Sequence, residues 1–279
     1  MQERIGLERF MPEKIELSER GKVAVDAAMA GGTAIMEKIS SMSASRKEGI
    51  GNFLTNCDLA SEEAVISFIK THFPKDLILT EETELDVPNI LEIENLWVID
   101  PLDGTNNLVY GRYRSAVSVA FVSKGETLAA AVYDPFHKEL FFSEKGKGSY
   151  LNSKKLEVGN EDELSRAVVT TDPAFEPQIM RYHLELLLNL PTTPPRILIR
   201  GSSVLSICEI AAKKTDLFFH SYLEPWDIAA ALLIVKEAGG IAKGLDGNEV
   251  NLLSNDIVVG NSTLVEQFVS FSKSLKNKS

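Results

Sequence analysis

The sequence is short of cysteine, of positive charge and of long apolar runs. Its two cysteines, Cys57 and Cys208, lie far apart and form no C-x-x-C pair, so we expect reduced, buried thiols and no disulfide framework. No apolar run approaches the roughly 20 residues that a membrane-spanning helix needs. The charged segment 1–22 lacks the apolar centre of a signal peptide. We therefore expect a cytoplasmic protein that does not enter a membrane.

The shortage of positive charge limits the partners. The chain has 29 Lys and Arg against 40 Asp and Glu, which gives a formal net charge of -11. An acidic surface argues against binding of nucleic acid or of an anionic membrane. It does not exclude an anionic substrate, because a bound cation can reverse the field at a site. The hydrophobic fraction of 44% and the charged fraction of 25% are typical of a globular protein.

The pattern of apolar residues predicts two halves within one compact unit. Residues 1–155 predict an α+β half with an antiparallel sheet, and residues 156–279 predict an α/β half in which strands and helices alternate. The expected elements are a small-residue helix over 18–42, an amphipathic helix over 61–73 with Ser61 as N-cap, and an antiparallel meander over 116–144. Three later helices are expected over 178–189, 203–213 and 225–239.

The stretch IDPLDGTNNL, residues 99–108, carries two carboxylates three residues apart at the end of an apolar strand. Pro101, Asp103, Gly104 and Asn106 are turn formers, so a plain strand-to-helix turn is one interpretation. A functional site is the other interpretation, because Asp100 follows a run that should be buried on both faces.

Three further acidic stretches stand beside small or turn-forming residues. Asp58 precedes a helix, Asp227 lies at a helix start after a proline, and Glu81 and Glu82 end a strand. Taken singly, the two aspartates are typical helix N-terminal acids, and the glutamates are typical of a solvated turn. Acids at the ends of several elements are also how a fold assembles a site for a hard cation.

Together these blocks resemble the inositol monophosphatase family of magnesium-dependent, lithium-sensitive phosphatases. The family pattern has a Glu-Glu pair, then D-P-x-D-G-T-x-N-F, then W-D-x-A-A-G, and TEET, DPLDGTNNL and PWDIAAA occur here in that order. Leu108 replaces the usual Phe, and Ala231 replaces the usual Gly of the last block. The resemblance implies a layered αβαβα sandwich of the inositol monophosphatase and fructose-1,6-bisphosphatase type, a phosphoric monoester hydrolase, and a homodimer.

The resemblance also implies which residues hold Mg²⁺, for which Mn²⁺ is the expected substitute. Glu81, Asp100 and the backbone carbonyl of Leu102 would hold a first ion. Asp100, Asp103 and Asp227 would hold a second ion, and Glu81 would reach a third through water. Cations are needed at such a site because carboxylates alone repel a phosphate dianion.

The catalytic roles follow from the same resemblance. Thr105, oriented by Asp58, would position a water for direct attack on phosphorus, and Glu81 would take part through the metal. The backbone N–H groups of Gly104 and Thr105 at a helix start would bind phosphate oxygens. Lys47 would add positive charge, although a solvated lysine is an equally good interpretation.

The segment GSSVL resembles the turn with which the family borders the alcohol part of its substrate. Inositol-specific members place an acid before the Trp-Asp block, and HSYLEP does not reproduce it; His220 falls near that position, with Glu224 as another candidate. The expected substrate contacts are Asp103, Gly104, Thr105, Gly201, Ser202, Ser203, His220 and Asp227.

The substrate itself stays open among inositol monophosphate, fructose 1,6-bisphosphate and 3'-phosphoadenosine nucleotides, and the chain length favours a small sugar or cyclitol phosphate. A haloacid-dehalogenase-type phosphatase has D-x-D instead of the D-x-x-D found here. A non-catalytic regulator that binds RNA or protein is the alternative outside the enzymes, and the intact set of acids argues against it. The other histidines have no ligand spacing and no assigned role: His72, His137 and His183.

Overall fold

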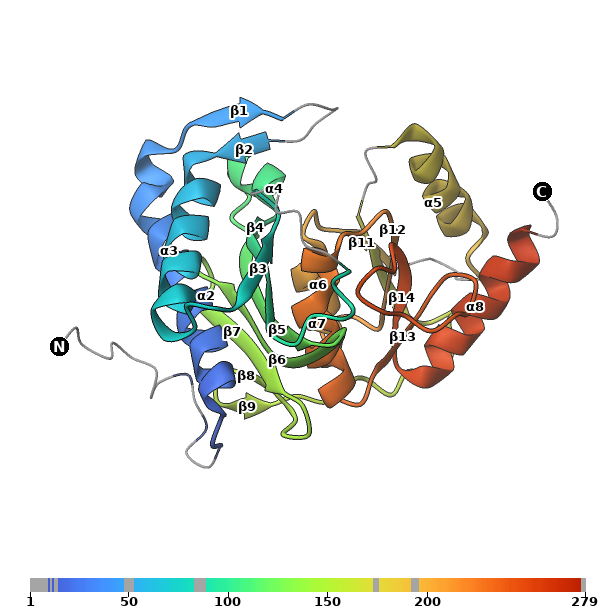
Figure 1. Cartoon of the computed structure of the whole chain (residues 1–279). Coiled ribbons are helices and arrows are strands. Elements are labelled where there is room, and N and C mark those ends of the chain that lie inside the picture. Colours follow the sequence, from blue (N-terminus) through green and yellow to red (C-terminus); the bar gives the residue numbers. More distant parts are fainter. Residues whose placement is uncertain are drawn as a thin grey trace.

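The computed structural model consists of five layers in the order helices, sheet, helices, sheet, helices (Figure 1). The αβαβα sandwich expected from the sequence is therefore confirmed. The structure describes residues 10, 12, 15–47, 53–82, 89–172, 176–191 and 196–276. No helix within these residues is long and apolar enough to cross a membrane.

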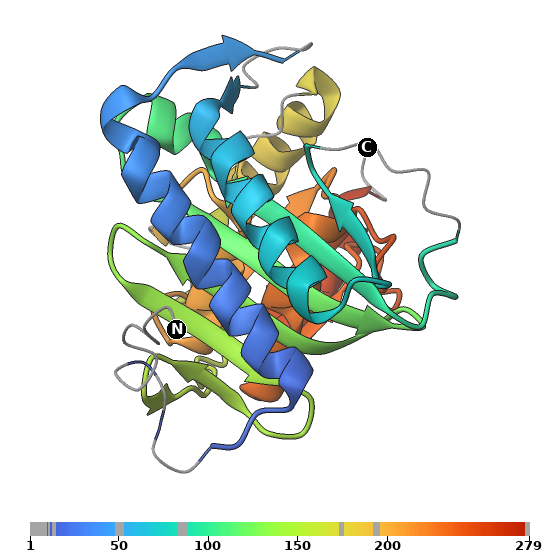
Figure 2. The same cartoon turned by 60° about the vertical axis from the view of Figure 1, so that its left-hand side comes forward.

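The first outer layer consists of two helices, α2 (Glu19–Lys38) and α3 (Asn56–His72), which lie across one face of a seven-stranded sheet (Figure 2). All neighbouring strands in this sheet are antiparallel except β3 and β4, so the expected meander is confirmed. In spatial order the strands are β3 (Leu77–Thr80), β4 (Leu96–Asp103), β5 (Ala116–Ser123), β6 (Glu126–Asp134), β7 (Glu139–Glu144), β8 (Ser149–Leu151) and β9 (Lys154–Lys155).

The start of α3 differs from the prediction. The N-cap is Thr55 and not Ser61, because the Thr55 hydroxyl accepts the N–H groups of Cys57 and Asp58, and the Asp58 carboxylate accepts the N–H of Thr55 in return. This capping box starts the helix six residues earlier than expected. Ser61 is buried inside the helix and donates a hydrogen bond to the carbonyl of Pro101 (2.7 Å), which ties α3 to the end of β4.

Two helices, α6 (Ser203–Ala211) and α7 (Pro225–Glu237), fill the space between the sheets. They are apolar on nearly every side because a sheet covers each of their faces. The second sheet has the order β11 (Arg196–Ile199), β10 (Val168–Thr171), β12 (Leu217–Ser221), β14 (Asp256–Gly260) and β13 (Ile241–Lys243). Its outer face carries α5 (Pro177–Asn189) and α8 (Ser262–Lys276).

Three apolar clusters fill the four spaces between the five layers, because the central cluster extends over both sides of the α6 and α7 layer. The central cluster takes residues from β4 to β7, from both middle helices and from the second sheet, so the two halves expected from the sequence share one core. The expected boundary falls in the connection between β9 and β10. Cys57 and Cys208 are buried and free, as expected.

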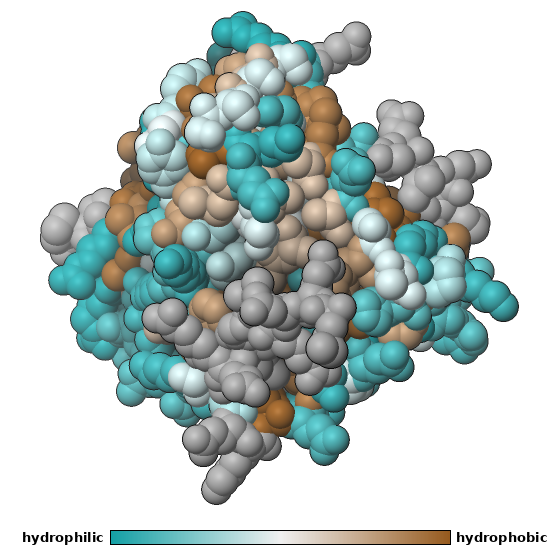
Figure 3. Space-filling view, turned by 90° about the vertical axis from the view of Figure 1, so that its left-hand side faces the viewer, coloured by the Kyte–Doolittle hydropathy of each residue, from teal (hydrophilic) through white to brown (hydrophobic). Residues whose placement is uncertain are grey.

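The outer surface of the α2 and α3 layer mixes polar and apolar side chains (Figure 3). The buried side of α2 is mostly alanine and glycine, which lets this helix lie close to the sheet. On its outer side Ala30 and Ala34 are half-buried and Met36 is exposed. The smaller elements are the hairpin of β1 (Ala44–Arg46) and β2 (Phe53–Thr55), the 3-10 turn η1 (Ile39–Ser41) and the short helix α4 (Thr105–Val109).

Candidate metal centre and active site

Asp100 and Asp103 both belong to β4, which the structure extends to Asp103. In a regular strand, residues three apart point to opposite faces of the sheet. Here the pairing is irregular, because Asp100 lies opposite Ser118 and Asp103 opposite Ala116, so that three steps on β4 match two on β5. This bulge lets both carboxylates point to one side. A plain strand-to-helix turn was one interpretation of this stretch, whereas both aspartates lie on a bulged strand that ends just before the turn at Gly104.

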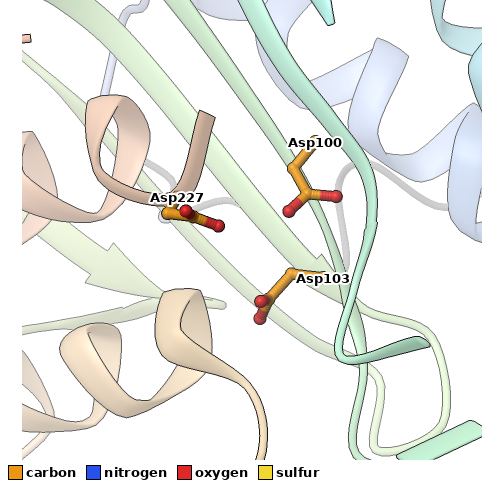
Figure 4. A group of neighbouring side chains, drawn as sticks. All are labelled: Asp100, Asp103 and Asp227. Atoms are coloured by element: carbon orange, nitrogen blue, oxygen red, sulfur yellow. The ribbon is translucent and has the colours of Figure 1, made fainter. Parts of the chain in front are cut away.

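Asp227, at the third position of α7, completes a cluster with these two residues (Figure 4). Each of the three aspartates offers a carboxylate oxygen, and these oxygens lie within 4.8 Å of one another. Burial, followed by mutual repulsion, raises the pKa of Asp100 and Asp227 well above the usual value, and it raises the pKa of Asp103 to about 7. Three carboxylates held this close repel one another, which is electrostatically costly. A divalent hard cation bound by their oxygens would offset this cost.

Glu81 lies beside the cluster, since its charge raises the pKa of all three aspartates. Lys47 bridges the glutamate pair, with its ammonium 3.0 Å from Glu81 and 2.7 Å from Glu82. Burial opposes the charge on Lys47, but the two carboxylates outweigh it and raise its pKa. Burial raises the pKa of Glu82 to about 7. Lys47 is therefore partly buried and paired with two carboxylates, which is not the environment of a solvated lysine.

Thr105 lies where the catalytic hypothesis needs it. Its hydroxyl is 2.8 Å from Asp58 and 2.9 Å from the carbonyl of Leu102, and it can donate to one of them at a time. The other oxygen of Asp58 caps α3, so the orientation of this carboxylate is fixed from two sides. Burial raises the pKa of Asp58. A hydroxyl whose proton is directed to a carboxylate presents its lone pairs elsewhere, which suits it to hold a water.

Gly104 makes the turn between β4 and α4 with φ of 83°. A Cβ atom at this position would lie 2.8 Å from the carbonyl oxygen of Arg114 and 3.2 Å from that of Gly201, so only glycine fits. Asn107 fills the same junction and directs its Nδ2 group to the carbonyls of Arg114 (2.8 Å), Arg200 (2.8 Å) and Gly201 (3.0 Å). The turn from β4 into α4 and the 200–203 loop are thus packed together.

The 200–203 loop runs from the end of β11 to the first residue of α6 and carries the expected substrate contacts Gly201, Ser202 and Ser203. Ser202 caps α6 by accepting the N–H of Leu205 and donates its own proton to Asp103. Both interpretations of this serine, helix cap and site residue, are therefore compatible with the structure. Ser203 donates to Asp172 (3.3 Å).

His220 lies on β12 and is buried against a second histidine, His183 of α5, with ring centroids 5.0 Å apart. Burial lowers the pKa of both imidazoles to about 4. The Nε2 atom of His183 accepts the N–H of Ser221 (3.1 Å). Glu224, the alternative to His220, caps α7 in a box with Asp227.

Three site residues were missed by the sequence analysis: Asn107, Asp172 and His183. Asp172 follows β10, and a signal for it existed, because it is one more acid at the end of an apolar strand. Asn107 was given no role, because its burial and its backbone partners become visible only in the folded chain. His183 had no signal in the sequence, since its partner is 37 positions away on another element.

The chain combines a layered αβαβα fold with a buried aspartate cluster beside its central helices. The model of the inositol monophosphatase family matches residues 16–276. The chain is therefore a member of the inositol monophosphatase family.

Among curated relatives, the Nus factor SuhB of Salmonella typhimurium LT2 is 34% identical over 251 residues, which are 89% of this chain and 93% of the relative. Among solved structures, the IMPase of Thermotoga maritima has a TM-score of 0.84 and 26% identity, over 94% of this chain and 99% of that one. An IMPase/NADP phosphatase in complex with Mg²⁺ and phosphate has a TM-score of 0.75 and 25% identity, over 86% and 89% of the two chains.

Proposed function

We propose that the protein is a Mg²⁺-dependent phosphomonoesterase that hydrolyses a small sugar or cyclitol phosphate similar to inositol 1-phosphate. The observation that carries this proposal is the cluster of Asp100, Asp103 and Asp227 beside the Thr105–Asp58 hydrogen bond. A cation held by these acids would offset the charge of the phosphate and activate a water. Mg²⁺ and phosphate in the structure of the IMPase/NADP phosphatase relative support this choice of ion.

Side chains from several elements supply the cation ligands and the groups that orient the water and the phosphate. Asp100 and Asp103 approach the cation site from the bulged strand, Asp227 approaches it from α7, and Glu81 adds charge from the end of β3. Leu102 presents its carbonyl between the two strand acids. Thr105, with its proton directed to Asp58, orients the attacking water, and the turn at Gly104 brings backbone N–H groups close to the phosphate.

The test is a panel of phosphoesters assayed with Mg²⁺ and with Mn²⁺. The panel includes inositol 1-phosphate, fructose 1,6-bisphosphate and 3'-phosphoadenosine 5'-phosphate, which separates the alternative substrates within the family. Asp100→Asn is expected to abolish turnover, whereas Asp246→Asn, in the exposed loop after β13, is expected to leave it unchanged. Absence of phosphate release from every ester, or near-normal turnover by Asp100→Asn, would contradict the proposal.

A second role is suggested by the name of the SuhB relatives, Nus factor. A regulatory protein of this fold would not need to keep its acids, whereas this chain keeps the aspartate cluster and the Thr105–Asp58 pair. The net charge of -11 also disfavours direct binding to nucleic acid. We therefore favour an enzyme over a regulatory binding protein. Binding of the purified protein to RNA at physiological salt would favour the regulatory protein instead.

The same proposal includes a homodimer, a cytoplasmic location and inhibition by Li⁺. Sedimentation velocity at micromolar concentration tests the dimer. Li⁺ carries one charge and would replace the cation held by Asp103 and Asp227 after turnover, so inhibition should increase with Mg²⁺ concentration. Activity that stays constant while Li⁺ rises into the range that inhibits a sensitive relative would contradict this part.

A further inference from the structure

The 200–203 loop lies directly on the turn from β4 into α4. Its Ser202 hydroxyl donates to Asp103, and its Gly201 carbonyl would lie 3.2 Å from a Cβ on Gly104. Any shift of this loop therefore moves the hydroxyl that fixes the Asp103 carboxylate. The position of the loop has to be set by something outside the turn itself.

Asp172 holds the loop from the other side. Its Oδ1 atom accepts the N–H groups of Gly201 (2.5 Å) and Arg200 (3.2 Å), and its Oδ2 atom accepts the hydroxyl of Ser203 (3.3 Å). Only 6% of Asp172 is exposed. A buried carboxylate is costly unless donors surround it, and these three donors all come from the 200–203 loop.

Asp172 is itself firmly supported. It follows β10, which has β11 on one side and β12 on the other. The imidazoles of His183 and His220 both lie against its backbone. The carboxylate is therefore presented from a packed strand end, and the loop adapts to it.

We propose that Asp172 is a positioning residue: by fixing the 200–203 loop it holds the Ser202 hydroxyl against Asp103 and so sets the orientation of that carboxylate for the cation and the substrate. The proposal rests on the proposed function for the role of Asp103. It requires that loss of Asp172 weakens cation binding through Ser202 and not through a general loss of stability.

The experiment measures Mn²⁺ binding directly, from the electron paramagnetic resonance signal of free Mn²⁺, together with kcat and KM. Asp172→Ala is expected to raise the Mn²⁺ dissociation constant by about tenfold or more, as is typical when a residue that orients a metal ligand is removed. Asp172→Asn keeps an acceptor for the two backbone N–H groups and is expected to restore most of the binding.

The matched control is Asp134→Ala. Asp134 is also buried and also accepts two backbone N–H groups, those of Phe136 (2.9 Å) and His137 (3.0 Å), but it lies at the end of β6, two strands away from β4. Its replacement should lower the melting temperature without changing Mn²⁺ affinity. If Asp172→Ala does not fold, Asp172→Ser, whose shorter side chain cannot hold both amides, takes its place.

A double-mutant cycle decides whether the effect passes through Ser202. In the background of Ser202→Ala, replacement of Asp172 should weaken Mn²⁺ binding by less than about threefold, because the hydroxyl that it positions is already gone. An unchanged Mn²⁺ affinity in a folded Asp172→Ala protein, or a full effect in the Ser202→Ala background, would overturn the proposal. The Mn²⁺ affinities of the single and double variants can be measured even if no phosphoester is hydrolysed. Failure of this proposal is therefore distinguishable from failure of the proposed function.

Discussion

At the scale of single residues, two carboxylates of the site perform two tasks each. Asp58 accepts the N–H of Thr55 with one oxygen and the Thr105 hydroxyl with the other. Asp227 accepts the N–H of Glu224 and also supplies an oxygen to the aspartate cluster. Helix cap and site ligand were alternatives in the sequence, but the third position of a helix satisfies both because a carboxylate has two oxygens.

Thr105 gives the prediction at this scale. Thr105→Ser keeps the hydroxyl and should keep much of the activity, whereas Thr105→Ala removes it and should lower kcat by roughly two to four orders of magnitude. Stopped assays with phosphate detection measure the difference, and circular dichroism checks that both variants fold. An Ala variant with the turnover of the Ser variant would contradict the role of the hydroxyl, as would retention of configuration at phosphorus.

At the scale of elements, the site depends on the turn from β4 into α4. Gly104→Ala meets both a positive φ of 83° and a carbonyl oxygen 2.8 Å from the new Cβ. Gly146 has a similar φ of 78° but nothing within 4 Å, so Gly146→Ala measures the cost of the backbone conformation alone. We expect about 1 kcal/mol of destabilisation at Gly146 and about 2 to 4 kcal/mol at Gly104, with loss of activity only at Gly104.

Urea unfolding of the two glycine variants measures these free energies of unfolding. Equal destabilisation of both variants would mean that the turn yields to the added methyl group. In that case the close approach of the Arg114 and Gly201 carbonyls would not restrict this position.

The paired histidines give a prediction at the scale of two packed elements, α5 and β12. Burial lowers the pKa of His183 and His220 to about 4, whereas histidines in the unfolded chain have a pKa near 6.5. Between these two pH values the unfolded chain binds protons at both histidines and the folded protein does not. Their contribution to stability is complete above pH 6.5 and is lost as the pH falls toward 4.

The slope attributable to each histidine is at most about 1.4 kcal/mol per pH unit. The raised pKa values of the aspartate cluster act in the opposite direction, so the measurement compares the wild type with His183→Gln, which keeps an acceptor for Ser221. The free energy of unfolding should fall more steeply between pH 6.5 and pH 4 in the wild type. Equal slopes would mean that His183 is protonated in the folded protein.

At the scale of the whole molecule, the sequence predicted the layered fold and the aspartate cluster because both depend on local signals. DPLDGT and PWD identify the ligands, and apolar periodicity identifies the meander and most helices. Asp172 could not be assigned in the same way, because its partners Arg200 and Gly201 are 28 and 29 positions away and meet it only through the pairing of β10 with β11. The bulge in β4 was missed for a similar reason, since register is a property of two strands.

The central helix layer has a consequence for synthesis on the ribosome. The inner face of the large sheet, with Val98, Ala120 and Val132, is complete once residue 155 has emerged, but its cover, α7, ends at Glu237. About eighty further residues must be translated before this apolar face can be shielded, which takes several seconds at ordinary elongation rates. A nascent chain stalled in that interval would expose this apolar face to other proteins, which favours aggregation.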